Sequence, residues 1–202
     1  MAKPNKRVDK KLININSIAE MVKIVQNGDK TLRQIAKEVP VSSITKPRIQ
    51  KIIADMNLAL DGESDGAAIA APQIGQSLRI FVVSRKVFVE DDKDHPATYN
   101  GIILKKRTPN LTFINPKILK ISKDKKLMEE GCLSVRPLFG KVRRASRATV
   151  EAYNEHGKKF IMEGSGLLAH VFQHEIDHLE GVLFIDKAKD LREIIINNNE
   201  PR

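Results

Sequence analysis

The chain has 202 residues, 41% of them hydrophobic, and 35 Lys and Arg against 25 Asp and Glu give a formal net charge of +10. This length suits one compact domain, and the hydrophobic share excludes a wholly disordered chain. No apolar run approaches the ~20 residues that span a bilayer, and no apolar segment follows the basic start at residues 1–7, so we expect neither a membrane span nor a secretory signal.

The basic surplus is spread over several short clusters, at residues 3–11, 105–107, 117–126 and 141–147. Aromatic residues make up only 4% of the chain and are not interleaved with these clusters, which argues against a surface that stacks nucleic acid bases. A solvated basic surface is the simpler interpretation. A surface that steers the protein towards an anionic, RNA-rich particle is the functional alternative.

Two helices are predicted in the N-terminal third. A capping-box sequence at residues 17–20, followed by apolar residues at helical spacing, predicts a short helix that stops at Asn27-Gly28. A second helix is predicted from Thr45 to Asp61-Gly62, with Pro47 in its first turn. We expect three segments: a partly disordered arm with the start of the first helix at residues 1–20, one domain at 21–190, and a short tail at 191–202.

The middle of the chain changes to strand-like patterns and a helix follows. The expected elements are strands at 80–83 and 111–114, the second closed by Asn115-Pro116; a polar surface insertion or long hairpin at 90–109; a hairpin of strands at 149–153 and 160–162; and a helix from about Ser165 to Gly181. An apolar triplet at 183–185 and a short amphipathic segment complete the pattern. Strands followed by a buried helix indicate an α+β domain.

The most informative stretch is Gln-His-Glu-Ile-Asp-His at residues 173–178. Residues four apart on a helix lie one turn above each other, about 6 Å along the axis, so His174 and His178 can bind one metal ion. Glu175 then lies beside the ion, where its carboxylate can take a proton from water. Core histidines are the alternative for the pair alone, but a Glu directly after the first His favours metal binding.

A catalytic metal usually takes three protein ligands and leaves one position open. The residues after His178 contain no His or Cys, and their acidic residues lie in no recognisable ligand motif. His170 lies about 12 Å along the axis from His178, too far to share one ion, and is expected to line the pocket instead. The strongest candidate is Cys132, because a thiolate binds transition metals well, although a small buried hydrophobic role is the alternative.

Cys132 is also the sole cysteine of the chain, which excludes an intrachain disulfide. This fits a reducing compartment, and we expect the protein to be cytoplasmic.

A third segment of interest is the run of small residues at 66–71, which precedes Pro72 and Gln73. Small side chains let a peptide-like substrate approach the backbone, and the Gln73 amide can donate to a developing oxyanion. Taken alone, this segment fits an Ala-rich turn of buried helix equally well.

Together the three segments resemble the peptide deformylase family. That family carries a Gly-rich stretch ending in Gln, an EGCLS box and QHExDH, which stand here at residues 66–73, 130–134 and 173–178. The resemblance extends over residues 24–190. The family has Gly and Leu where this chain has Ala68 and Ile69, and it often has Val/Ile-Pro where this chain has Val-Arg-Pro at 135–137.

The resemblance implies a role for each matching residue. Cys132, His174 and His178 would hold one divalent ion, Fe²⁺ first, with Zn²⁺, Ni²⁺ or Co²⁺ as alternatives. Glu175 would act as general base and then acid, and the Gln73 side chain with the Leu133 backbone N–H would stabilise the oxyanion. Substrate-binding residues would be Gly66, Ala67, Ala68 and Gly131 along the peptide, and Leu167, His170 and Val171 around the methionine side chain. The implied fold is a single α+β domain whose antiparallel strands wrap around a buried helix in the C-terminal half that carries HExxH.

We therefore expect a metal-dependent hydrolase that removes the formyl group from the N-terminal formyl-methionine of newly made polypeptides and releases formate. Its expected partners are N-formyl-methionyl peptides and nascent chains, with ribosome proximity through the basic surface, no membrane contact and a monomeric state. A zincin-type metallopeptidase and a non-catalytic, metal-stabilised module that binds RNA or ribosomes are the alternatives. Formate release distinguishes the first function from both alternatives.

Overall fold

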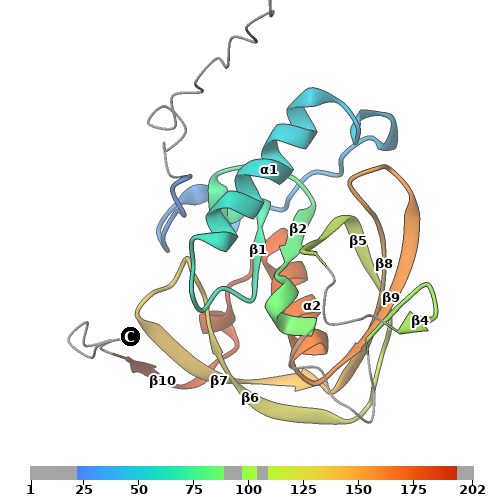
Figure 1. Cartoon of the computed structure of the whole chain (residues 1–202). Coiled ribbons are helices and arrows are strands. Elements are labelled where there is room, and N and C mark those ends of the chain that lie inside the picture. Colours follow the sequence, from blue (N-terminus) through green and yellow to red (C-terminus); the bar gives the residue numbers. More distant parts are fainter. Residues whose placement is uncertain (1–21, 89–96, 104–108, 195–202) are drawn as a thin grey trace, which may run out of the picture.

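A seven-stranded sheet forms the centre of the structure, a computed structural model that describes residues 22–88, 97–103 and 109–194 (Figure 1). Its strands are antiparallel to their neighbours, in the order β1-β2-β5-β8-β9-β3-β4. They span Ala68–Ala70 (β1), Ile80–Val83 (β2), Leu111–Ile121 (β5), Arg147–Tyr153 (β8), Lys159–Ser165 (β9), Thr98–Tyr99 (β3) and Ile102–Ile103 (β4).

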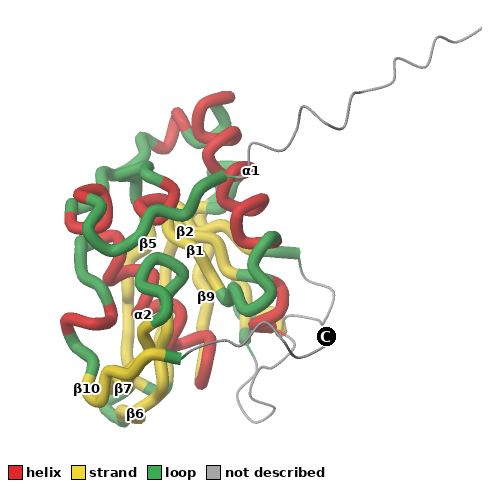
Figure 2. Tube along the Cα trace, turned by 90° about the vertical axis from the view of Figure 1, so that its left-hand side faces the viewer, coloured by secondary structure: helices red, strands yellow, loops and turns green. Residues whose placement is uncertain are grey.

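A second, three-stranded antiparallel sheet has the order β10-β7-β6 and lies at the lower end of the molecule in both views (Figure 2). Its strands are Lys125–Gly131 (β6), Leu138–Ala145 (β7) and Lys189–Glu193 (β10). Two α-helices, Pro47–Asp61 (α1) and Gly166–Leu179 (α2), and short 3₁₀ helices complete the described part of the chain. This is the expected α+β architecture.

Strand β2 is buried on both faces, which explains its unbroken apolar sequence. Ile80 and Val82 belong to one hydrophobic cluster with α1, whereas Phe81 and Val83 belong to another with α2. In Figure 1, α1 lies over the end of the sheet formed by β1 and β2, and α2 lies at the centre, enclosed by strands. Most residues of α2 are buried, and the helix packs against strands of both sheets.

Helix α1 confirms the prediction for residues 45–62. Pro47 stands in its first turn, where the missing N–H costs no hydrogen bond, and Ile49, Ile52, Ile53 and Met56 are buried along one face. Helix α2 likewise begins after Ser165 and ends before Gly181, as expected. Its Gln173 holds it to the end of β7, because the side-chain amide donates to Ala145 O and accepts from Ala145 N, both at 3.0 Å.

The helix predicted at residues 17–28 is wrong for the part that can be described, because residues 22–26 have no helical structure. Val25 N donates to Gln73 O at 2.9 Å and Asn27 N donates to Ser134 O at 2.7 Å. These backbone groups therefore bond to distant segments, which replaces the local bonds of a helix. Residues 1–21, with the expected arm, lie outside the described residues.

Strand β5 continues past Asn115-Pro116 to Ile121, so the strand end expected at this dipeptide is wrong. The pairing of β5 with β8 shifts register between Ile114 and Lys117, and Asn115 has a φ of 51°. The Asn115 side chain also exchanges two hydrogen bonds with the backbone of Val39, at 2.8 and 2.7 Å. A bulge supported by a tertiary contact thus accommodates Pro116 within the strand.

Several other elements depart from or extend the predicted pattern. Strands β6 and β7 were not predicted, since β6 begins with two exposed lysines and Lys141, Arg143 and Arg144 interrupt the apolar residues of β7. Within the polar stretch at 90–109, residues 98–103 form the hairpin of β3 and β4, while 90–96 and 104–108 lie outside the described residues, as do residues 195–202 of the expected tail. None of the helices in the described segments has the length and hydropathy needed to cross a membrane.

Candidate active site

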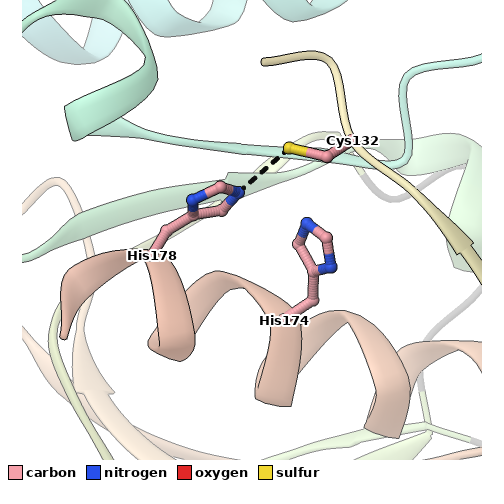
Figure 3. A group of neighbouring side chains, drawn as sticks. All are labelled: Cys132, His174 and His178. Carbon is pink, nitrogen blue, oxygen red and sulfur yellow. Dashed lines mark hydrogen bonds between the residues drawn. The ribbon is translucent and has the colours of Figure 1, made fainter. Parts of the chain in front are cut away.

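Three side chains with metal-binding atoms meet where α2 passes the end of β6. His174 and His178 point from successive turns of α2 towards Cys132, which directly follows β6 (Figure 3). Their ligand atoms all lie within 4.8 Å of one another. The two imidazoles of α2 and the thiol, which is distant in the sequence, therefore lie together, as the sequence predicts.

The Cys132 sulfur is surrounded by polar hydrogens. Gln73 Nε2 donates to Sγ at 3.5 Å, Ser134 N donates to it at 3.4 Å, and His178 Nε2 lies 3.2 Å away. The sulfur therefore lies within reach of two N–H donors and of one imidazole nitrogen. Burial lowers the pKa of His178 well below its usual value, which favours the neutral imidazole that can also act as a ligand.

Glu130 orients the other imidazole. His174 Nδ1 lies 2.9 Å from Glu130 Oε2, an arrangement in which Nδ1–H donates to the carboxylate and Nε2 is left to face the thiol. Burial raises the pKa of Glu130, but its hydrogen bonds with His174 and Arg144 outweigh that effect and lower the pKa to about 2. Glu130 is therefore a carboxylate, and it fixes both the tautomer and the direction of the His174 ring.

Arg144 in turn neutralises this buried carboxylate. Its Nε and Nη2 donate to the two oxygens of Glu130 at 2.7 and 3.0 Å, and its Nη1 donates to Asp177 Oδ2 at 2.6 Å. Asp177 also accepts from Lys187 Nζ at 2.7 Å. The network ties β6, β7 and α2 together behind the three sulfur and nitrogen ligands.

The sequence predicts no role for Arg144 or Asp177, and Glu130 stands out there only as the first residue of the EGCLS box. The register of β6 against β7 brings Glu130 opposite Gly140, and Arg144 lies four residues further along β7. A sequence signal for this network was absent, because the pairing of the two strands was itself not predicted.

Glu175 lies at the cavity wall, and the residue is only 3% exposed. Its Oε2 has no hydrogen-bond partner among the described residues. Burial raises the pKa of Glu175 to about 7, against the opposing effect of the neighbouring His174. A carboxylate with a pKa near neutrality can both accept and return a proton, which fits the predicted general base.

Gln73 is held in one orientation by a local turn. It lies in the 3₁₀ helix Ala71–Ile74, where its side-chain Oε1 accepts from Ala70 N at 2.7 Å. With the oxygen engaged in this way, the Nε2 group points to the Cys132 sulfur. The Gln73 amide therefore presents a donor, and not an acceptor, to the site. The alternative of an Ala-rich turn of buried helix does not describe residues 68–70, which form strand β1, and a short buried 3₁₀ helix begins only at Ala71.

A cavity of about 250 Å³ opens beside these groups. Its walls include every residue predicted to contact substrate: Gly66, Ala67, Ala68, Gly131, Leu167, His170 and Val171. Leu133 also lines it, as do Gln73, Cys132, His174 and Glu175. The predicted substrate-binding residues therefore line the same cavity as the predicted catalytic groups and two of the three predicted metal ligands.

Gly131 is required by close packing at this cavity. A Cβ at this position would lie 2.5 Å from Phe139 Cε1, closer than side-chain contacts allow. His170 is part of this wall, with Nδ1 3.5 Å from Glu130 Oε1, and burial lowers its pKa to about 4. It therefore contributes an uncharged ring to the wall, and it is not part of the three-ligand group.

The sequence is similar to that of known enzymes over most of its length. A family model described as Polypeptide deformylase matches residues 21–193. The peptide deformylases of Desulfitobacterium hafniense and Halothermothrix orenii are 41% and 40% identical to this chain, over 82% and 87% of it and over 93% and 99% of the relatives.

The fold is also similar to that of solved structures. The peptide deformylase of Thermotoga maritima has a TM-score of 0.68 and 34% identity, covering 84% of this chain and 98% of that one. The peptide deformylase of Synechococcus elongatus in complex with actinonin has a TM-score of 0.68 and 31% identity, covering 94% of this chain and 88% of that one. The motifs, the fold and the arrangement of the site agree with these similarities, and the chain belongs to the peptide deformylase family.

Proposed function

We propose that this enzyme hydrolyses the formyl group from the N-terminal formyl-methionine of newly made polypeptides and releases formate, with one divalent metal ion held by Cys132, His174 and His178. The observation that supports this most directly is the meeting of three ligand atoms within 4.8 Å, beside a cavity that Glu175 and Gln73 also line. A closed structural metal site needs neither of these two residues.

The donor set fits a transition metal. One thiolate and two imidazoles suit Fe²⁺, Zn²⁺, Ni²⁺ or Co²⁺, and Fe²⁺ is our first choice. The carboxylate of Glu130 behind His174 is the outer partner expected of a ligating histidine. When bound, the ion supplies Lewis-acid chemistry, which lowers the pKa of water and polarises a carbonyl.

Each protein group then has a defined task. Glu175 accepts a proton from the attacking water and delivers it to the amine nitrogen as the C–N bond to the formyl carbon breaks. The Gln73 Nε2 group and the Leu133 backbone N–H donate to the oxygen that becomes negative after attack. The products are formate and a free amino terminus, so atoms and charge balance.

The cavity accounts for the choice of substrate. Leu167, Val171 and the neutral ring of His170 form a wall suited to a methionine side chain, and Gly66, Ala67, Ala68 and Gly131 leave room for the peptide backbone. Ala68 is the first residue of β1 and lines the cavity, so its methyl group faces a space that a bound peptide would share. A structure of the Acinetobacter baumannii enzyme bound to Met-ala-ser, 28% identical to this chain, supports a peptide occupant.

The remaining expectations concern the setting of the enzyme. We propose a cytoplasmic monomer with its working domain at residues 21–190 and proximity to ribosomes through its basic surface. Exposed lysines in the turn after β5 and at the start of β6, such as Lys123, Lys125 and Lys126, support an anionic neighbour. Salt-dependent co-sedimentation with ribosomes would test this part separately.

The decisive experiment is an anaerobic assay of formate released from formyl-methionyl peptides, with the bound metal quantified in the same sample. We expect release that requires a stoichiometric divalent ion. Cleavage of internal peptide bonds without formate release would indicate a metallopeptidase instead. RNA binding without any turnover would indicate the non-catalytic module.

A further inference from the structure

Arg136 joins the two walls of the cavity at its mouth. Its Nη2 donates to Asp65 Oδ1 at 2.7 Å and lies 2.9 Å from Glu63 Oε2. Arg136 belongs to the connection between β6 and β7 that also carries Cys132, whereas the two acids lie between α1 and β1. Both Arg136 and Asp65 line the cavity. The three residues therefore form a cluster, here called the mouth cluster, at the exposed edge of the cavity.

The guanidinium retains unused donors. Arginine has five N–H groups, and in the mouth cluster one nitrogen, Nη2, serves both carboxylates. Among the described residues, Nη1 and Nε of Arg136 have no hydrogen-bond partner, and the side chain is 41% exposed. Ion pairs this exposed contribute roughly 0–1 kcal/mol to folding, so stability alone gives a weak reason for the arrangement.

We propose that Arg136 binds a backbone carbonyl oxygen of the peptide downstream of its formyl-methionine, and that Glu63 and Asp65 are positioning residues that hold the guanidinium at the mouth. This inference rests on the proposed function. A peptide whose first residue fills the cavity carries its following carbonyls past the mouth, because every residue has one. A neutral acceptor suits Arg136, since the two carboxylates already exceed its single positive charge, and a charged donor strengthens the hydrogen bond.

The test compares formyl-Met-Ala-Ser with formyl-methioninamide, which has no second residue. In Arg136→Ala we expect the ratio of kcat/KM for the tripeptide to that for the amide to fall about tenfold, mainly through KM. Arg136→Lys should recover part of the loss. The double variant Glu63→Gln, Asp65→Asn should lower the ratio less than Arg136→Ala. Arg48→Ala removes an exposed arginine at the start of α1 and is the matched control. We expect its kcat/KM ratio to equal that of the unmodified enzyme.

Equal losses on the two substrates, or a loss confined to kcat, would overturn the inference and indicate a structural role for the mouth cluster. Thermal unfolding of each variant identifies loss of folding, and Arg136→Gln replaces Arg136→Ala where the latter does not fold. The unmodified enzyme with formyl-methioninamide tests the proposed function by itself. If the unmodified enzyme releases formate from formyl-methioninamide and the kcat/KM ratio is unchanged in Arg136→Ala, the proposed role of Arg136 is wrong and the proposed function stands.

Discussion

At the scale of single residues, Glu175 and Glu130 show how environment divides the work of two like side chains. Both are buried and both lie near His174, yet burial raises the pKa of Glu175 to about 7, whereas hydrogen bonds from His174 and Arg144 lower that of Glu130 to about 2. Glu130 is therefore suited to a permanent charge that orients a ligand, and Glu175 to the transfer of a proton.

Replacement of the proton-transfer group should separate chemistry from binding. In Glu175→Ala we expect formate release to fall about 10²- to 10⁴-fold, the usual contribution of a general acid–base group, while the bound metal and the fold are retained. Steady-state kinetics with metal analysis would check this. Glu163→Ala, which removes an exposed glutamate from β9, is the control and should keep full activity. Unchanged turnover in Glu175→Ala would remove the general-base assignment.

Replacement of the thiol should act on the metal first. Cys132→Ser substitutes a harder and weaker ligand, so we expect less bound ion after dialysis than in the unmodified protein. Metal content per chain, measured by elemental analysis, decides the outcome. Ser134→Ala is a suitable control two residues away, because the Ser134 hydroxyl has no partner among the described residues. Equal metal content in Cys132→Ser and the unmodified protein would contradict the thiolate ligand.

At the scale of secondary-structure elements, charged contacts decide how the pieces are held around the site. The buried network of Glu130, Arg144 and Asp177 joins β6, β7 and α2, and the more exposed pair of Arg33 and Asp186 joins two 3₁₀ helices, Lys30–Arg33 and Phe184–Asp186. Burial makes the first contact costly to break, whereas solvent screens the second.

Removal of the central cation of the buried network should strongly destabilise the fold. Arg144→Met leaves the carboxylates of Glu130 and Asp177 without their main partner, and we expect a loss of about 3–5 kcal/mol in the free energy of unfolding. Urea denaturation of the metal-free proteins measures it. Arg143→Met, at the exposed neighbouring position of β7, should change stability by about 0.5 kcal/mol or less. Similar values for both variants would show that the network contributes little.

The exposed pair should contribute a pH-dependent stability. The hydrogen bonds from Arg33, at 2.5 and 3.1 Å, lower the pKa of Asp186 below 3.8, so the folded state favours the carboxylate. This contribution is complete above the unfolded value of 3.8 and is lost as the pH falls through the lower folded value.

We therefore expect Asp186→Asn to be less stable than the unmodified protein at neutral pH, by up to about 1 kcal/mol because solvent screens the pair. The difference should shrink as the pH falls below 3.8. Urea midpoints across this range measure it. Asp190→Asn, at a mostly exposed carboxylate on β10, is the control. A difference that stays constant with pH would contradict an ionic origin.

At the scale of the whole molecule, the site lies where separate layers of the fold meet. α2 packs against the large sheet, Cys132 follows a strand of the small sheet, and Gln73 lies between β1 and β2. An ion held by Cys132, His174 and His178 would therefore cross-link the small sheet to the central helix, and it would stabilise the folded state over the unfolded chain.

Metal removal should accordingly lower thermal stability as well as activity. At an ion concentration 100 times its dissociation constant, binding stabilises the folded state by about 2.7 kcal/mol, so a chelator should lower the melting temperature measurably. Differential scanning calorimetry with and without chelator measures the shift. In Cys132→Ser the shift should be smaller. An unchanged melting temperature on removal of a quantified ion would show that the ion does not link these layers.

Elements whose signals are local can be predicted from the amino-acid sequence alone. Helical spacing in α1 and α2, the two-sided apolar run of β2 and the position of Glu175 between two histidines on one helix all depend on residues within one or two turns. The sequence also restricted the thiol to Cys132, because no other cysteine exists. Resemblance to a family supplied the roles of Gln73, Leu133 and the residues that line the cavity.

Only the tertiary structure decided the rest, because those features depend on contacts between distant segments. Backbone hydrogen bonds to Gln73 and Ser134 keep residues 22–26 out of a helix. The hydrogen bonds of Asn115 with Val39 allow β5 to continue past Pro116. The Arg144 side chain on β7 reaches Glu130 on β6, although Arg144 stands opposite Lys126 in the strand register, and Glu130 in turn orients His174. Local periodicity cannot predict hydrogen bonds and ion pairs of this kind. The residues that they join are distant in the sequence, and they approach one another only when the chain has folded.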